Sequence, residues 1–256
     1  MIRMTMDYGE IQKRYLNLVK GKGAPLGIKL LEEKEEAPEK VLFPDQDRAL
    51  CQYLKEASVY QKIRGVTEEN LGGCVIGARV LGFKELPEEI KQGWMEGFGY
   101  SEERYNELVE KMEKLPLGKY EAAVIAPLKE FEELEMDPEA VITMINTAQS
   151  YLLLQGVFDK TGEKTNATMN GHATCETIAP VQKEGKTWIS VPCGGARSIS
   201  SAQDDEIWMG MTPEKLEKAL DRMEETNIRY PPAVNQMIIT PPNPKHPLTP
   251  MITTED

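Results

Sequence analysis

The fold is decided by the stretch AVITMINTAQSYLLLQGVF, residues 140–158. Its first seven residues form an apolar run that predicts a buried strand, and the residues that follow predict a helix that begins without an intervening loop. The start of such a helix carries backbone N–H groups that attract anions and polar ligand atoms. Asn146 and Gln149 at this junction are therefore candidate cofactor-binding residues, although every strand-to-helix junction offers similar donors.

Further strands and helices alternate on both sides of this stretch. Strands are predicted within residues 26–31, 60–67, 120–127, 187–192 and 205–211, and helices within residues 7–19, 45–57, 101–115 and 212–227. Residues 86–100 are predicted to be irregular. The alternation predicts the α/β (or α+β) class, with a single domain at residues 1–240 and a mixed, partly parallel sheet covered by helices. Residues 241–256 form a proline-rich C-terminal segment, which we expect to be a mobile or extended tail.

The composition argues against several classes of function. The chain has 256 residues, of which 40% are hydrophobic and 28% charged, as is typical of a globular protein with a large core. Its net charge of −12 and the lack of a basic stripe argue against binding to nucleic acid or to an anionic membrane surface. The sequence also has no long apolar run of about 18 residues and no signal-peptide pattern. We therefore predict a cytoplasmic protein.

Motifs of the common enzyme classes are missing as well. The sequence contains no P-loop, no G-x-G-x-x-G at the start of a helix, no G-x-S-x-G and no H-E-x-x-H. Because the chain has only two histidines, a Ser-His-Asp triad or a histidine-rich metal site is nearly excluded. The chemistry that remains to be explained is that of the four cysteines.

Two of these cysteines lie close together in the sequence, within residues 171–198. Cys175 follows His172 by three residues, a spacing that would place both on one face of a helix, and Cys193 precedes a pair of glycines. Cys74 stands in a similar glycine-flanked turn. We predict a metal or iron–sulfur site with Cys74, Cys175 and Cys193 as thiolate ligands and with His172 or Cys51 as the fourth ligand.

Two other interpretations of the cysteines stay open. Long gaps between cysteines are not diagnostic, because a typical iron–sulfur motif places two or three ligands in one tight loop. The cysteines could instead be unrelated buried side chains. Alternatively, Cys175 or Cys193 could be a lone nucleophile, and a helix that begins near Ala173 would then increase the acidity of Cys175. The shortage of histidine bases argues against this third interpretation.

Arg197 is a candidate for holding an anionic ligand. It follows the glycine pair Gly194 and Gly195, whose backbone allows close approach, and a guanidinium suits a carboxylate or a phosphate. Together with Asn146 and Gln149, these residues form the predicted cofactor-binding set. The alternative is an ion pair between Arg197 and the acidic run of residues 204–206.

Several of these features follow one another in a fixed order. The order is CQYL at 51–54, Gly-Gly-Cys at 72–74, Asn-Thr-Ala-Gln at 146–149, Cys175, Cys-Gly-Gly-Ala-Arg at 193–197 and Asp-Glu-Ile at 205–207. It resembles the uncharacterised family called domain of unknown function 169, over most of the chain. The resemblance implies a protein of an anaerobic bacterium or archaeon, without an established activity. Because anaerobes use oxygen-sensitive iron–sulfur chemistry widely, the resemblance favours the metal-site interpretation.

Two functional hypotheses follow. The first is an iron–sulfur or other cysteine-ligated metal protein with a redox or cofactor-related role. The second is a binding module for a small anionic ligand or cofactor in a pocket with Arg197, where the cysteines only line the pocket. The sequence does not decide whether the protein is an enzyme, and a homo-oligomer also stays open.

Overall fold

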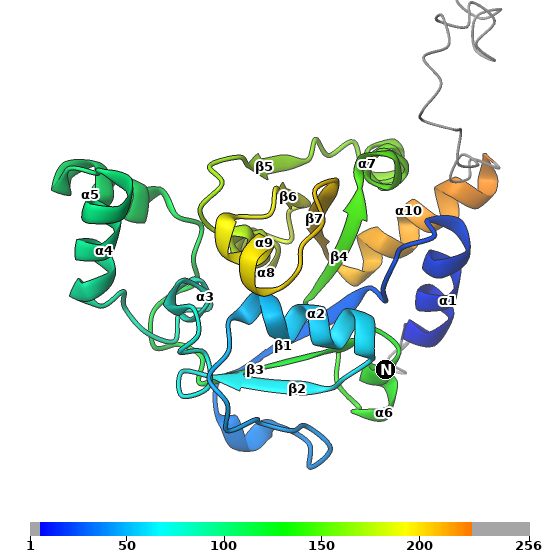
Figure 1. Ribbon diagram of the computed structural model, residues 1–256. Coiled ribbons are helices and arrows are strands. Elements are labelled where there is room, and N and C mark those ends of the chain that lie inside the picture. Colours follow the sequence, from blue (N-terminus) through cyan, green and yellow to red (C-terminus); the bar gives the residue numbers. More distant parts are fainter. Residues whose placement is uncertain (1–5, 227–256) are drawn as a thin grey trace, which may run out of the picture.

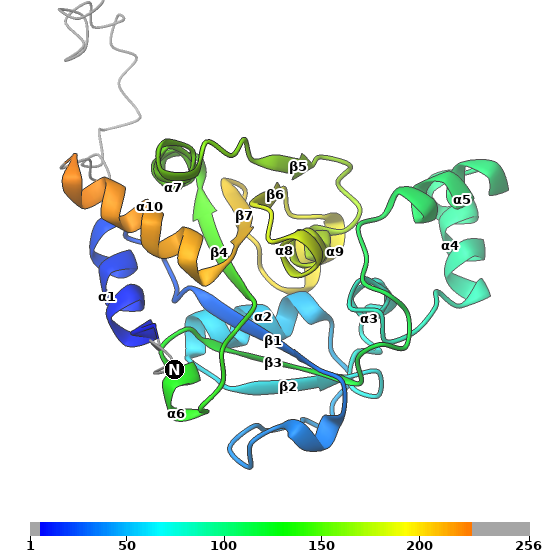
Figure 2. The same cartoon turned by 180° about the vertical axis from the view of Figure 1, so that it is seen from behind.

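The computed structural model describes residues 6–226. Within this range the chain forms a single α/β domain in which ten α-helices surround a seven-stranded mixed sheet (Figures 1 and 2). The predicted fold class is therefore confirmed. The proline-rich segment 241–256 and the proposed domain boundary at residue 240 both lie outside the described residues.

The sheet has the strand order β2-β3-β1-β4-β7-β6-β5. Its strands are β1 Leu26–Leu31, β2 Arg64–Thr67, β3 Ala122–Pro127, β4 Ala140–Asn146, β5 Asn166–Thr168, β6 Trp188–Ser190 and β7 Glu206–Met211. Among the described strands, β5 and β6 pair in parallel and all other neighbours are antiparallel. The sheet is mixed, as predicted, but its parallel part is one edge pair.

Helices precede, separate and follow the strands along the chain. They are α1 Tyr8–Leu18, α2 Leu50–Tyr60, α3 Val75–Val80, α4 Glu88–Phe98, α5 Glu102–Lys111, α6 Glu130–Glu133, α7 Thr147–Thr161, α8 Ile178–Glu184, α9 Gly194–Ile199 and α10 Pro213–Glu225, with short 3₁₀ helices η1 Lys34–Glu36 and η2 Thr174–Thr177. No helix in the described part of the chain is both long and apolar enough to cross a membrane.

The prediction that residues 86–100 are irregular is wrong, because they contain α4. This helix follows Pro87, ends at Gly99 in a left-handed conformation and buries none of its residues. It stands with α5 at one side of the molecule, away from the sheet (Figure 1). Its apolar residues Ile90 and Trp94 are only partly buried against the first core, and Gly93 and Gly97 lower its helix propensity, which explains why the sequence pattern did not indicate it.

The stretch 140–158 forms the middle of the structure. Strand β4 lies between β1 and β7, and Ile142 is paired with Leu26 on one side and with Gly210 on the other. Helix α7 begins at the residue after β4, as predicted. Asn146 and Gln149 make this abrupt change possible, since each accepts a hydrogen bond from the other's backbone N–H at 2.9 Å.

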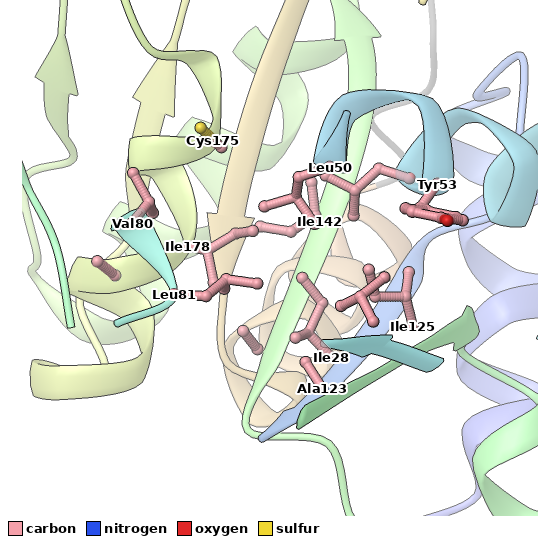
Figure 3. Packing of buried hydrophobic residues seen from close by; sticks show 14 of the residues in the cluster. Ile28, Leu50, Tyr53, Val80, Leu81, Ala123, Ile125, Ile142, Cys175 and Ile178 are labelled. Atoms are coloured by element: carbon pink, nitrogen blue, oxygen red, sulfur yellow. The ribbon is translucent and has the colours of Figure 1, made fainter. Parts of the chain in front are cut away.

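Side chains of the central strand alternate between two cores. Ile142 and Met144 face the core under α2, α3 and α8, and Val141 and Ile145 face the core under α1, α7 and α10. This alternation is the period of two expected of a strand that is buried on both faces. Figure 3 shows the first core, with Leu50 of α2 beside Ile142 and with Cys175 at its margin.

Candidate functional site

All four cysteines of the chain line one small cavity at the margin of the first core. The cavity has a volume of about 30 Å³, and we call it the sulfur cavity. Its sulfurs come from four separate segments: Cys51 from the first turn of α2, Cys74 from the residue before α3, Cys175 from η2 and Cys193 from the residue before α9. The structure thus places Cys74, Cys175 and Cys193 around one cavity.

Two glycines hold Cys74 close to Cys51. A Cβ atom on Gly73 would lie 2.7 Å from the backbone N of Ala49 and from the backbone C of Arg48, so the turn before Cys74 touches the backbone at the start of α2. A Cβ atom on Gly77 would lie 2.6 Å from the Cβ of Leu50. Only glycine permits these approaches, which press α3 and its preceding turn against α2.

Thr174 joins the other two cysteines. Its hydroxyl accepts a hydrogen bond of 2.6 Å from the backbone N–H of Cys193, and Thr174 itself precedes Cys175 in η2. The backbone carbonyl of Thr174 also accepts bonds from the Ser190 and Thr177 hydroxyls, at 2.9 and 2.8 Å. The sequence analysis missed this residue, although its position next to Cys175 was a signal that it could help to place the sulfur.

The sulfur cavity is an apolar environment for its thiols. Burial raises the pKa of Cys51 to about 11, against a smaller lowering by a hydrogen bond with Ser200. Burial likewise raises the pKa of Cys74, where backbone N–H groups of Ile76 and Gly77 act in the opposite direction. The pKa of Cys175 is raised well above its usual range by burial and then by the other three sulfurs. A helical turn does begin at Ala173, but the expected gain in acidity of Cys175 is wrong because burial dominates.

The sulfurs do not converge on one point. Among the described residues, no group of three or more His, Cys, Asp or Glu side chains is arranged to hold a single metal ion. Cys193 instead accepts a hydrogen bond of 3.4 Å from the backbone N–H of Ala196, at the start of α9. The predicted ligand set therefore stays a prediction, with four sulfurs around one cavity.

His172 also lines the sulfur cavity, but its ring belongs to an aromatic cluster. Its Nε2 atom lies 2.7 Å from the Tyr100 hydroxyl, and its ring packs against Trp94 and Phe98 at centroid distances of 5.5 and 5.7 Å. The helical turn starts after His172, so the ring and Cys175 do not share a helix face. Cys51 and His172 were the two candidates for the fourth ligand. Cys51 lines the cavity, whereas Nε2 of His172 already contacts the Tyr100 hydroxyl, so Cys51 is the better candidate.

Arg197 forms an ion pair with the acidic run of residues 204–206, which was the alternative to binding an anionic ligand. Its Nη1 lies 3.2 Å from Oδ1 of Asp204, and its Nε donates to the carbonyl of Pro192 at 3.2 Å. Arg197 contributes to the lining of neither cavity described here. Of the two glycines before it, Gly195 lines the sulfur cavity, whereas the space around Gly194 is open.

A second and larger cavity lies farther along α2. It has a volume of about 500 Å³ and we call it the polar pocket. Its lining residues are Lys22, Gly23, Arg48, Gln52, Lys55, Glu56, Ser58, Val59, Tyr60, Met144, Ile145, Asn146, Gln149, Ile199, Ser200, Ser201, Gln203, Asp205 and Glu206. The predicted residues Asn146 and Gln149 thus line a pocket, but Gln149 is engaged in the cap of α7 and donates to the carbonyl of Lys20 at 2.6 Å.

Comparison with known proteins identifies the family. The family model of the domain of unknown function 169, described as an uncharacterised ArCR, matches residues 16–222. The chain belongs to this family. A relative from Methanocaldococcus jannaschii, named Uncharacterized protein MJ0308, is 24% identical over 229 residues, which are 86% of this chain and 96% of the relative. No solved structure matches the chain.

Proposed function

We propose that this family member is an iron–sulfur protein, or another protein with a thiolate-bound metal, with a redox or cofactor-related role in an anaerobe. Cys51, Cys74, Cys175 and Cys193 are the proposed ligands. A single observation carries the proposal: the four cysteines of a 256-residue chain, from four separate segments, line one cavity. Unrelated buried cysteines would have no reason to meet in this way.

The chemistry of the lining fits a soft metal centre. Four cysteine thiolates are the ligand set of the common iron–sulfur clusters and of structural zinc. Backbone N–H groups point at two of the sulfurs, Cys74 and Cys193, and hydrogen bonds of this kind tune the potential of a cluster. Because burial keeps free thiols protonated, a metal would have to displace their protons when it binds.

The geometry favours a cluster over a single ion. One zinc ion requires all sulfurs at about 2.3 Å from a common point, and no group of the described side chains is arranged in that way. In a cluster the thiolates bind different irons, so the sulfurs stand farther apart. A cavity of about 30 Å³ has room for little more than a water molecule, so a cluster would require the short segments that carry the cysteines to move outward.

The position of the centre suits electron exchange. Cys51, Cys74 and Cys193 are partly exposed and only Cys175 is buried. A cluster held by these residues would therefore lie just below the surface, where an electron partner could approach it.

The binding-module hypothesis and the lone-nucleophile interpretation are less well supported. Anion binding at Arg197 competes with its contacts to Asp204 and Pro192. A nucleophilic thiol at Cys175 is disfavoured because burial raises its pKa far above neutral pH.

The test is anaerobic purification of the full chain, followed by a visible absorption spectrum and by measurement of iron, zinc and acid-labile sulfide. We expect a coloured protein with iron and sulfide, and we expect that serine at any one of the four cysteines reduces both. His172→Gln is the matched control, because His172 lines the same cavity and we expect this variant to keep its iron. A colourless protein that takes up neither iron with sulfide nor zinc would refute the proposal, and zinc without sulfide would replace the cluster by a single ion.

A further inference from the structure

The polar pocket has an ammonium group with unused donors in its wall. Nζ of Lys55 lies 2.6 Å from Oε2 of Glu206, and the Lys55 side chain is 18% exposed. Glu206 is also held by Nε1 of Trp208 at 2.7 Å and by the backbone N–H of Gln203 at 3.3 Å. An ammonium donates three hydrogen bonds, and the described residues supply Lys55 with this one acceptor. Lys55 can therefore bind a further acceptor in the pocket.

Gln52 lies one turn before Lys55 on the same helix. Its Oε1 accepts a hydrogen bond of 2.9 Å from the backbone N–H of Ala49, which caps α2. This fixes the amide so that its NH₂ group stays available, since none of the described residues accepts from it. Residues three apart share one face of a helix, so the free donors of Gln52 and Lys55 are neighbours in the pocket wall.

The charged side chains that line the pocket are paired. Glu56 is held between two guanidiniums: Nη1 of Arg48 contacts one carboxylate oxygen and Nε of Arg64 lies 2.9 Å from the other. Lys55 is balanced by Glu206, and Lys22 at the rim is balanced by Asp205 at 3.8 Å. The three cations and three carboxylates of the lining therefore balance, and the spare donors of Lys55 and Gln52, not an excess of charge, are what would attract an anionic group.

Part of the pocket wall is apolar, beside the polar residues Ser58, Asn146, Gln149, Ser200, Ser201 and Gln203. Met144 and Ile145 of β4 contribute to its wall, together with Val59 and Tyr60 at the end of α2 and Ile199 of α9. A volume of about 500 Å³ lies within the range of sites for small molecules. The ligand should therefore combine one anionic group with an apolar body.

From these observations we infer that the polar pocket binds a small organic carboxylate, with Lys55 and Gln52 as donors to the carboxylate and the apolar wall around its body. Because Cys51 precedes Lys55 by four residues, the bound carboxylate would lie one helical turn from the sulfur cavity. The inference does not depend on what the cysteines hold.

The test is calorimetric titration of the full chain with benzoate, with benzamide as the neutral molecule of the same shape. We expect saturable one-to-one binding of benzoate, and binding of benzamide weaker by about tenfold or more because it lacks the charge. Phenyl phosphate distinguishes the anionic group, and we expect it to bind more weakly than benzoate. Equal binding of benzoate and benzamide, or stronger binding of phenyl phosphate, would overturn the assignment of a carboxylate.

Two variants locate the site. Gln52→Glu keeps an oxygen to accept from Ala49 but adds a negative charge, so we expect benzoate binding to fall by about tenfold while the fold is kept. Arg197→Met is the matched control, and we expect it to bind benzoate like the unchanged chain. Normal binding by a folded Gln52→Glu variant would place the site elsewhere. Since metal content is measured separately, a protein that binds benzoate but takes up neither iron with sulfide nor zinc supports this site and refutes the proposed metal centre.

Discussion

The sulfur cavity and the polar pocket share a wall, but their linings are opposite in character. Ile199 contributes to both cavities, and consecutive residues of α2 divide between them, Cys51 facing the first and Gln52 the second. Within residues 6–226, no Lys, Arg, Asp or Glu side chain lines the sulfur cavity, whereas six charged residues line the polar pocket. The volumes also differ, at about 30 Å³ against about 500 Å³.

This difference separates two kinds of ligand. A tight apolar cavity with four sulfurs suits a group that stays in place and is held by bonds to the protein. A wide pocket with paired charges and spare donors suits a molecule that enters and leaves. The candidate site of a permanently bound centre and the candidate site of a ligand that binds and dissociates are therefore one turn of α2 apart.

The largest effect is expected at the ion pair in the wall of the polar pocket. Glu206→Leu would leave the ammonium of Lys55 and the indole N–H of Trp208 without their acceptor, in a place where the Glu206 side chain is 7% exposed. We expect unfolding in urea to require about 3 kcal/mol less free energy.

Asp205→Asn is the control for this variant. Asp205 also lines the polar pocket, but its pair with Lys22 is exposed on both sides, and we expect a change within about 0.5 kcal/mol. Similar losses from the two variants would show that the wall and the rim of the pocket are not different environments.

The next effect tests how the sulfur cavity is closed. Gly73→Ala adds a Cβ atom 2.7 Å from the backbone of residues 48 and 49, and we expect a loss of about 2 kcal/mol in the free energy of unfolding together with faster alkylation of Cys74. Gly194→Ala is the matched change beside Cys193. A Cβ atom added there would meet no other atom of the described residues within 4 Å, and we expect the free energy of unfolding to stay unchanged. If both changes are tolerated equally, close contact between the turn and α2 does not close the cavity.

The smallest effect is expected far from both cavities and provides a reference for an ordinary ion pair. Burial raises the pKa of Glu163, but the hydrogen bond from Lys215 and that from the backbone N–H of Thr187 outweigh it, so the pKa is lowered overall. The stabilisation by this carboxylate is therefore complete above its unfolded pKa of about 4.3 and is lost as the pH falls through the lower pKa of the folded protein.

We expect Glu163→Gln to lower the free energy of unfolding by about 1 kcal/mol at pH 7, with the difference shrinking below about pH 4.3. Urea unfolding across this pH range measures it. Glu133→Gln, in an exposed pair with Lys40, should leave the free energy of unfolding essentially unchanged at any of these pH values. A difference for Glu163→Gln that grows in acid would contradict the direction of the pKa shift.

The fold was predictable where strands are buried on both faces. Residues 26–31 and 140–146 were predicted as strands and form β1 and β4 with those bounds. Helix α4 was missed because Gly93 and Gly97 interrupt it and its apolar residues Ile90 and Trp94 are only partly buried. The strand order could not be read from the sequence either, since it depends on pairings between distant segments.

The candidate site was predictable in part. The glycine-flanked cysteines indicated that Cys74 and Cys193 belong together, and they do line one cavity. The choice between Cys51 and His172 required the position of Tyr100, which comes from the unpredicted part of the chain. Lys55 was missed, although its spacing of four from Cys51 was visible in the sequence.

The spread of the cysteines along the chain has a consequence for biosynthesis. A ribosome makes Cys51 early and Cys193 only after β1 to β6 have been synthesised. A centre held by all four residues can therefore be inserted only late in translation or after release, and until then the thiols are open to oxidation. Under the proposed iron–sulfur function, metal delivery would follow synthesis of Cys193, and a cell short of iron would accumulate chains without the centre.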